Sequence, residues 1–147
     1  MTTARLQPLL LALSLALGAG GTWLGLAAGR AGDTVWCRAG SQPMHRLELV
    51  FGLSRQGRAD VTEAEWAAFL DREVTPRFPD GLTVLAGNGQ WRNASGVAVR
   101  EPARLLLVWV TPTADLEARI TALRQAWKTA HAQESVLRAD GTSCVSL

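Results

Sequence analysis

The sequence has few of the residues from which recognisable metal and nucleophile sites are built. Two cysteines and two histidines occur in 147 residues, and their spacing matches no common zinc-ligand pattern. No Gly-x-Ser-x-Gly segment is present, and Gly87-Asn88-Gly89 is too short for a phosphate-binding loop. The sequence therefore predicts neither a metal site nor a cofactor, and it identifies no catalytic residue.

A large excess of charge of one sign is also lacking. Lys and Arg number 15 against 13 Asp and Glu, the net charge is +2, and the positive residues are scattered. The sequence therefore predicts no basic stripe of the kind that binds nucleic acid. Tyrosine is absent, but there are six tryptophans. Three of them fall on predicted apolar faces and are expected in the core: Trp66, Trp109 and Trp127.

The longest uncharged run lies near the N-terminus, from Leu6 to Gly29, and consists mainly of Leu, Ala and Gly. A short positive start followed by such a run is typical of a secretory signal, here with cleavage expected after Gly29. Residues 1–29 are therefore predicted to be a signal peptide, or an uncleaved membrane anchor, since about 20 apolar residues span a bilayer. In a bacterial host the protein is expected to be periplasmic or secreted, or anchored in the inner membrane with its domain facing the periplasm.

The most apolar segment of the remaining chain is Leu105 to Val110, which has no polar side chain. A strand that is apolar on both faces is usually central in a sheet, with both faces covered. Residues 45–54 alternate in polarity, as expected for a strand with one buried face. Residues 30–44 are polar and irregular, and we interpret them as a lead-in to a single domain at residues 45–147.

Two amphipathic segments predict helices. Thr62-Glu63-Ala64-Glu65 forms a capping box, and the first helix has its apolar side at Trp66, Phe69, Leu70 and Val74. The second helix is expected to start with Thr111 or Thr113 as its N-cap. Its buried stripe is predicted at Leu116, Ile120, Leu123 and Trp127. A short strand at residues 133–139 and a turn at Gly141 are expected to follow.

Two turns compete for the hairpin between the helices. Asn88-Gly89 is a strong two-residue turn signal, and Asn93-Ala94-Ser95-Gly96 is a plausible longer turn. We favour the longer turn, which would pair residues 82–92 with residues 97–110. The glycines at 87 and 89 would then lie opposite Pro102, where a bulge is expected because neither residue type favours a regular ladder.

The predicted order of strand, helix, hairpin, helix and strand is that of a ferredoxin-like βαββαβ fold, which is an α+β fold. It contains an antiparallel four-stranded sheet with two helices on one face. The first and last strands pair antiparallel in this fold, which would bring Cys144 close to Cys37. A disulfide between these cysteines fits an exported protein, and two free thiols are the alternative.

Several segments resemble a family of exported bacterial proteins that is known only as a domain of unknown function. These segments are residues 75–84, Gln90-Trp91-Arg92, Arg100-Glu101-Pro102, residues 133–138 and Cys144-Val145-Ser146. The resemblance extends over residues 37–147 and implies a small secreted or periplasmic domain. It implies no activity, cofactor or catalytic residue. Cys37 follows Trp36 rather than a small residue, so it lacks the context of a lipid-modified cysteine.

The candidate ligand-binding residues are charged side chains on or beside the strands: Arg46, Glu48, Arg92 and Arg138. Further polar residues in such positions are Arg100, Glu101, Gln133 and Glu134. If the arginines converge, they could bind an anionic small molecule, because Arg makes paired contacts to carboxylate or phosphate. Solvated ion pairs across strands are the alternative. Trp91 is expected either to be an exposed binding residue or to pack across the hairpin.

We interpret the chain as a non-catalytic domain that self-associates as a homodimer through its open sheet face, because Leu105–Val110 is apolar on both sides. The alternative is a small-molecule-binding or enzymatic domain that pairs into a dimeric α/β barrel around an anionic ligand, which is an analogy of fold alone.

Overall fold

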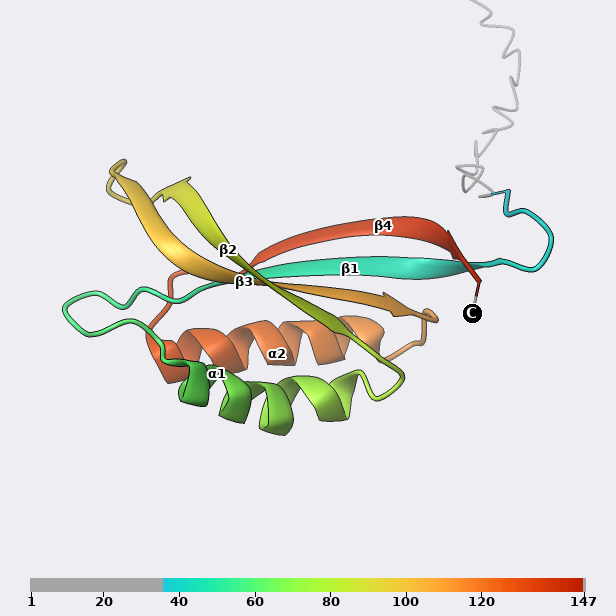
Figure 1. Cartoon of the computed structure of the whole chain (residues 1–147), viewed down its shortest axis with the longest axis horizontal. Coiled ribbons are helices and arrows are strands. Elements are labelled where there is room, and N and C mark those ends of the chain that lie inside the picture. The colour runs from blue at the N-terminus through green and yellow to red at the C-terminus, as the bar shows by residue number, and fades with distance from the viewer. Residues whose placement is uncertain (1–35, 147) are drawn as a thin grey trace, which may run out of the picture. The chain divides into compact units, whose positions relative to one another are not determined.

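The computed structural model describes residues 36–146, and the predicted signal or anchor segment lies outside them. Four strands form one antiparallel sheet in the order β2-β3-β1-β4 (Figure 1). Their bounds are β1 (Gln42–Gly52), β2 (Thr83–Arg92), β3 (Ala98–Val110) and β4 (Leu137–Val145). The predicted antiparallel sheet with β3 in an interior position is confirmed.

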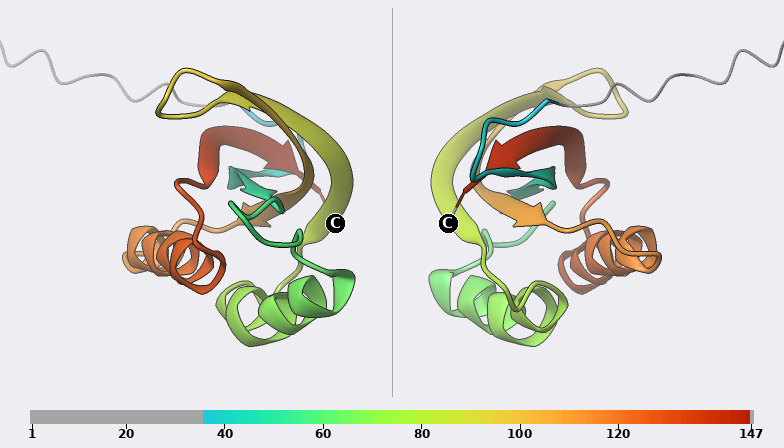
Figure 2. Two further views of the ribbon diagram at one scale, coloured as in Figure 1. Left: turned by 90° about the vertical axis from the view of Figure 1, so that its left-hand side faces the viewer. Right: turned by 90° about the vertical axis from the view of Figure 1, so that its right-hand side faces the viewer.

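Two helical segments cover the same face of this sheet, and the other face is left open (Figure 2). The first begins as α1 (Glu63–Phe69) and continues through a π turn at Leu70–Val74 and a 3₁₀ turn at Thr75–Arg77. The second is α2 (Leu116–His131). The predicted α+β class is therefore confirmed. Within residues 36–146, no helix has both the length and the apolar character needed to cross a membrane.

The core lies between the sheet and the helices and follows the predicted apolar faces. β1 contributes Leu47, Leu49 and Phe51, which are completely buried. The helices supply Trp66, Phe69 and Val74 from the first segment and Leu116, Ile120, Leu123 and Trp127 from α2, all buried. Trp109 is an exception to the prediction, because it lies on the open face opposite Arg46 and is 38% exposed.

The predicted longer turn joins β2 to β3, but the predicted bulge is wrong. The register is regular from Thr83 opposite Leu107 to Arg92 opposite Ala98, with Asn88 opposite Pro102. The reason is the direction of the Pro102 peptide groups, since its carbonyl accepts from the Leu53 N–H at 2.9 Å. N–H and C=O groups of one strand residue point to the same side. The position where Pro102 lacks an N–H therefore faces β1, at the end of that strand. No hydrogen bond between β2 and β3 is lost.

Two further boundaries differ from the prediction. The N-cap of α2 is Asp115 rather than Thr111 or Thr113. A turn with a 3.1 Å bond from the Leu116 N–H to the Thr113 carbonyl precedes the helix, and the Thr113 hydroxyl accepts from the Arg119 guanidinium at 2.9 Å instead of capping. Gly141 is not a turn, because β4 begins at Leu137 and runs through Gly141 opposite Arg46.

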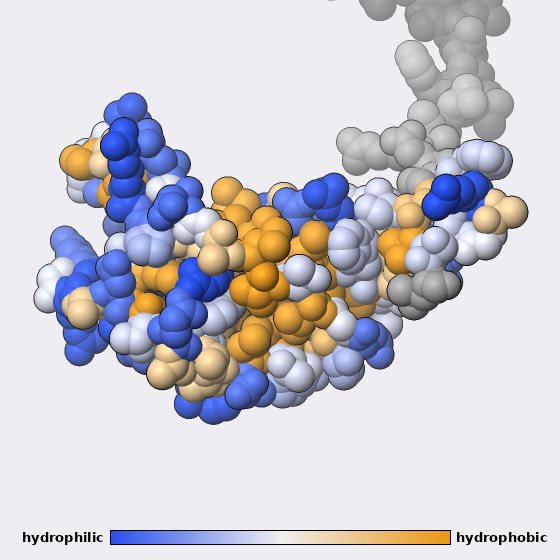
Figure 3. All heavy atoms as spheres, in the orientation of Figure 1, coloured by the Kyte–Doolittle hydropathy of each residue, from blue (hydrophilic) through white to orange (hydrophobic). Residues whose placement is uncertain are grey.

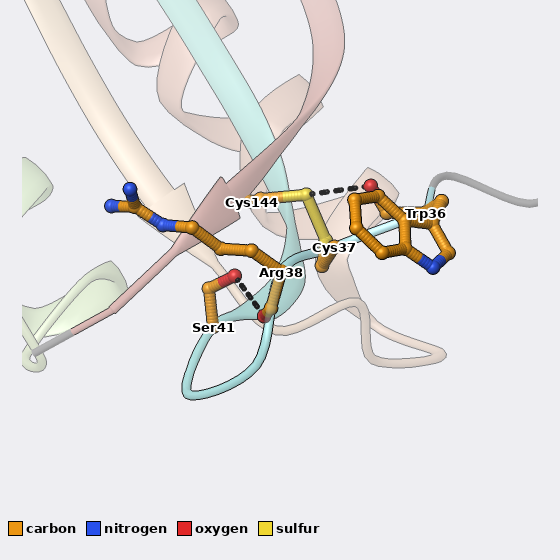
Figure 4. Close-up of a disulfide and its surroundings, with 5 residues drawn as sticks. All are labelled: Trp36, Cys37, Arg38, Ser41 and Cys144. Atoms are coloured by element: carbon orange, nitrogen blue, oxygen red, sulfur yellow. Dashed lines mark hydrogen bonds between the residues drawn. A yellow bond between two sulfur atoms is a disulfide. The ribbon is translucent and has the colours of Figure 1, made fainter.

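The predicted disulfide joins Cys37 to Cys144, with their Cα atoms 5.4 Å apart (Figure 4). It lies where β1 begins, since Pro43 is opposite Cys144 in the sheet. The Ser41 hydroxyl donates to the Arg38 carbonyl at 2.8 Å and closes the turn between the disulfide and β1 (Figure 4). The lead-in segment is thereby tied to the last strand.

Candidate functional site

The β2–β3 hairpin extends well beyond the end of β1. The last β1–β3 pair is Gly52 with Ala103, followed by the Leu53–Pro102 bond, so residues 98–101 of β3 pair with β2 alone. Two-stranded ribbons twist more strongly than strands within a wider sheet. The hairpin accordingly arches over the open face (Figure 2), and its tip stands away from the rest of the domain (Figure 3).

A cavity of about 360 Å³ lies beneath this arch, on the face away from the helices. Its apolar walls come from Val50, Ala103 and Leu137, and its polar groups come mainly from the hairpin and from the segment after α2. The complete lining is Val50, Gly52, Gly89, Gln90, Trp91, Glu101, Ala103, Gln133, Ser135 and Leu137. A volume of this size is typical of small-molecule sites.

Glu101 is the charged residue of this cavity, and it is only 8% exposed. Its Oε1 atom accepts a 2.5 Å hydrogen bond from the Trp91 indole N–H. Its Oε2 atom accepts a 3.0 Å bond from the backbone N–H of Ser54. The carboxylate is thus held in one place by a side chain of β2 and by the backbone just after β1.

Gly52 leaves the space in which the carboxylate lies. A Cβ atom added at Gly52 would come within 2.5 Å of both Glu101 carboxylate oxygens. Any other residue at this position would therefore push the Glu101 side chain out of its present place. The glycine is required here by a close approach of groups rather than by a backbone angle.

The side of the cavity that Gln133 and Ser135 line depends on how α2 ends. Ala132 adopts the left-handed conformation, with φ at 53°, and its N–H bonds the Lys128 carbonyl. This turn directs Gln133 toward the end of β1, where its Nε2 atom donates to the Ser54 carbonyl at 2.5 Å. Ser54 therefore links the carboxylate of Glu101 to the segment that follows α2.

A second, more polar cavity of about 380 Å³ shares Trp91, Glu101 and Gln133 with the first. Its other lining residues are Ser54, Arg55, Gln56, Asn93, Ser95, Val99, Ala132 and Glu134. Arg55 is bound to Glu65 through its Nη1 atom at 2.9 Å. Trp91, Glu101 and Gln133 thus separate an apolar cavity from a polar one.

The structure does not bring the four predicted ligand-binding residues together. Arg46 and Glu48 form an ion pair with each other on the open face. Arg138 lies opposite Leu49 on the helix side, where its Nη1 atom contacts Glu117 of α2 at 2.7 Å and its Nε atom contacts Asp140. Arg92 donates to the Gly96 carbonyl in the hairpin turn at 2.8 Å. Each arginine thus has a partner of its own.

These local partners also set the ionisation of the groups around Arg138. The hydrogen bond from Arg138 lowers the pKa of Glu117, and Glu117 and Asp140 raise the pKa of Arg138. Arg138 is therefore held in a closed ion-pair network between β4 and α2. No group of three or more His, Cys, Asp or Glu side chains within residues 36–146 is placed to hold a metal ion.

The sequence of β3 contains one indication of the cavity. Alternation in β3 places Glu101 on the same face as Ala103, Leu105 and Leu107, so it is a lone charge in an apolar row. Local patterns mark Glu101 and Gln133 only as polar residues on or beside strands. The convergence of Gln133 with Trp91 depends on the end of α2 and on the twist of the hairpin, which no local pattern encodes.

The sequence over residues 46–147 matches the model of a family described as "Protein of unknown function (DUF3574)". The chain belongs to this family. Three of the segments that carry the family resemblance line the first cavity, through Gln90 and Trp91, Glu101, and Gln133 with Ser135. No curated protein matches this sequence.

Two solved structures of a phage SAM lyase resemble this family member in fold. The complex with S-methyl-5'-thioadenosine has a TM-score of 0.56 at 13% identity and covers 78% of this chain and 95% of the lyase chain. The apo state has a TM-score of 0.53 at 14% identity, with 78% and 97% covered. CutA from Synechococcus elongatus in complex with Bis-Tris has a TM-score of 0.41 at 17% identity, with 71% and 83% covered. At these identities the similarity to the lyase concerns the fold alone.

Proposed function

We propose that this protein is a binding domain that acts outside the cytoplasm and holds a small organic molecule beneath the β2–β3 hairpin. The observation that carries the proposal is Glu101, a buried carboxylate that is fixed by two donors at the edge of an apolar cavity. Burying a carboxylate costs free energy that the packing of the sheet does not require. A fixed polar group in an apolar concavity is the usual arrangement of a ligand site.

Two features support action outside the cytoplasm. The Cys37–Cys144 disulfide is of a kind that persists in the periplasm or in secreted proteins. The uncharged run from Leu6 to Gly29 fits either a cleaved signal or a membrane anchor. Mass measurement of the protein isolated from the cell envelope of its own host, periplasm and membranes together, distinguishes them, since cleavage removes residues 1–29.

The ligand proposal is tested by native mass spectrometry of that protein and by a thermal-shift panel of small metabolites. S-methyl-5'-thioadenosine belongs in the panel, because a phage SAM lyase of similar fold was solved with it. The variant Gly89→Leu places a side chain in the cavity, and its Cβ meets only ordinary contacts. Gly87→Leu is the matched control, because Gly87 does not line this cavity.

We expect at least one compound to stabilise the wild type and Gly87→Leu but not Gly89→Leu. A compound that stabilises all three proteins equally binds elsewhere and contradicts the proposal. The absence of both a retained ligand and a stabilising compound also counts against it.

Self-association through the open face is a second candidate function, favoured by the apolar side chains that this face exposes. Leu85 and Leu137 are 50% and 58% exposed, and Trp109 is exposed as well. The Arg46–Glu48 pair on the same face gives it both signs of charge, so a second copy related by a two-fold axis would be complementary to it. We propose a homodimer that packs these faces together.

Sedimentation velocity at micromolar concentration tests the homodimer. We expect a dimer for the wild type and a monomer for Trp109→Lys, because a lysine would be buried without a partner in the interface. Arg58→Lys, in the exposed loop before α1, is the control and should remain dimeric. A monomeric wild type at this concentration would overturn the second candidate.

A further inference from the structure

We infer that the cavity beneath the hairpin selects an organic cation, such as a protonated amine attached to an apolar body, with Glu101 as its counter-ion. This inference rests on the proposed ligand-binding function and names the chemical class of the ligand. It differs from the anionic ligand that the scattered arginines suggested, because those arginines do not reach the cavity.

The charge of the cavity points to a cation. Glu101 is the ionisable side chain among the lining residues, and it takes part in no ion pair within the described residues 36–146. Its two partners, the Trp91 indole and the Ser54 N–H, are neutral donors that orient the carboxylate without cancelling its charge. A buried and unpaired carboxylate attracts a cation more strongly than one in water.

The arginines that directly adjoin Glu101 and its partner Ser54 in the sequence are engaged elsewhere. Arg100 precedes Glu101, so its side chain lies on the opposite face of β3, where its Nε atom donates to Gln90 at 3.0 Å. Arg55 is held by Glu65 and by the carbonyl groups of Ala59 and Asp60. Neither arginine is available to neutralise Glu101, so the ligand supplies the positive charge.

The remaining lining fits the rest of such a ligand. The Trp91 ring borders the cavity, and an indole face attracts a cation. Gln133 and Ser135 offer oxygen atoms that can accept from a protonated amine, which has donors only. Val50, Ala103 and Leu137 form an apolar wall against which a hydrocarbon or aromatic body can pack.

The experiment compares three probes of similar size and shape by isothermal titration: 2-phenylethylamine, 2-phenylethanol and phenylacetate. We expect the amine to bind at least about tenfold more tightly than the alcohol, because a hydrogen bond to a charged group is worth more than one between neutral groups. We expect phenylacetate not to bind. This comparison uses the wild-type protein and needs no variant.

Glu101→Gln then removes the charge, and its single amide oxygen can accept from only one of the two donors, Trp91 and Ser54. The readout is therefore the ratio of the two affinities, and the variant should lose the preference for the amine over the alcohol, about tenfold in the wild type. Glu134→Gln removes an exposed carboxylate of the neighbouring cavity and should change neither affinity. Trp91→Phe should weaken the binding of the amine and of the alcohol together, since it alters the cavity wall and removes the indole N–H that holds the Glu101 carboxylate in place.

Equal binding of the amine and the alcohol, or binding of phenylacetate, overturns the cationic ligand but leaves the proposed binding function standing. Failure of the amine to bind at millimolar concentration also overturns it. The binding function itself is judged separately, by whether Gly89→Leu removes the stabilisation seen with the metabolite panel.

Discussion

Trp127 is the residue on which the core is centred. Its ring lies 4.7 Å from Phe69, 5.2 Å from Phe51 and 5.4 Å from Trp66, between ring centroids, and it is completely buried. His131 packs against the same ring at 4.1 Å, and burial lowers the pKa of this imidazole. One side chain of α2 thus touches β1, α1 and the end of its own helix.

Replacing Trp127 should be among the most damaging single changes to stability. We expect Trp127→Ala to lower the free energy of unfolding by about 3–5 kcal/mol, because a large aromatic side chain leaves a cavity that its neighbours cannot fill. Urea denaturation followed by circular dichroism measures the loss. The control is Trp109→Ala on the open face, and a similar loss for both variants at monomeric concentrations would contradict the assignment.

At the scale of elements, the start of α1 shows a sequence pattern and a structure in full agreement. The Thr62 hydroxyl accepts from the Glu65 N–H at 3.2 Å, and the Glu65 carboxylate accepts from the Thr62 N–H at 2.8 Å. Arg55 reaches the same carboxylate at 2.9 Å. The Thr62 N–H and the Arg55 guanidinium together lower the pKa of Glu65 to about 2.

This capping carboxylate predicts part of the acid sensitivity of the fold. Since the pKa is depressed in the folded state, its contribution is present above the ordinary value of 4.5 and is lost as the pH falls toward about 2. Glu65→Gln should therefore be less stable than the wild type at neutral pH and lose less stability across that interval. Urea midpoints measured across the interval test this, with Glu134→Gln as the control that should follow the wild type.

The elements that sequence patterns predicted well are those whose contacts are local. The capping box of α1, the alternation of β1 and the stripe of α2 each depend on neighbours within a few residues. The bulge near Pro102 was wrong because its absence depends on where β1 ends. The core position of Trp109 was wrong because an apolar row in an interior strand was assumed to be covered on both faces.

For the whole molecule, the disulfide closes a loop of 107 residues in sequence separation and fastens the lead-in segment to β4. Cys37→Ser with Cys144→Ser should lower the free energy of unfolding by about 2–5 kcal/mol, because the unfolded chain regains freedom. Urea denaturation with and without a reductant measures the effect. The wild type should lose stability in the reductant and the double variant should not; an equal response of both would contradict the prediction.

The site as a whole was less predictable than the fold. The central residues of the site come from three separate elements: Glu101 from β3, Trp91 from β2 and Gln133 from the segment after α2. They meet because the β2–β3 hairpin extends beyond the end of β1 and twists over the sheet. Strand lengths and twist of this kind are set by the complete sheet. The ligand-binding residues predicted from the sequence are charged side chains on or beside strands, and the structure pairs each of them locally.

The position of the disulfide has a practical consequence. It lies at the start of β1, and the cavity lies at the other end of the same strand, where Val50 and Gly52 line it. Val145, close to the C-terminus, is paired there with Gln42. A sensor chip or an affinity resin coupled through the C-terminus would therefore hold the domain by the edge farthest from its arch, so that immobilised protein presents its binding face to the solution.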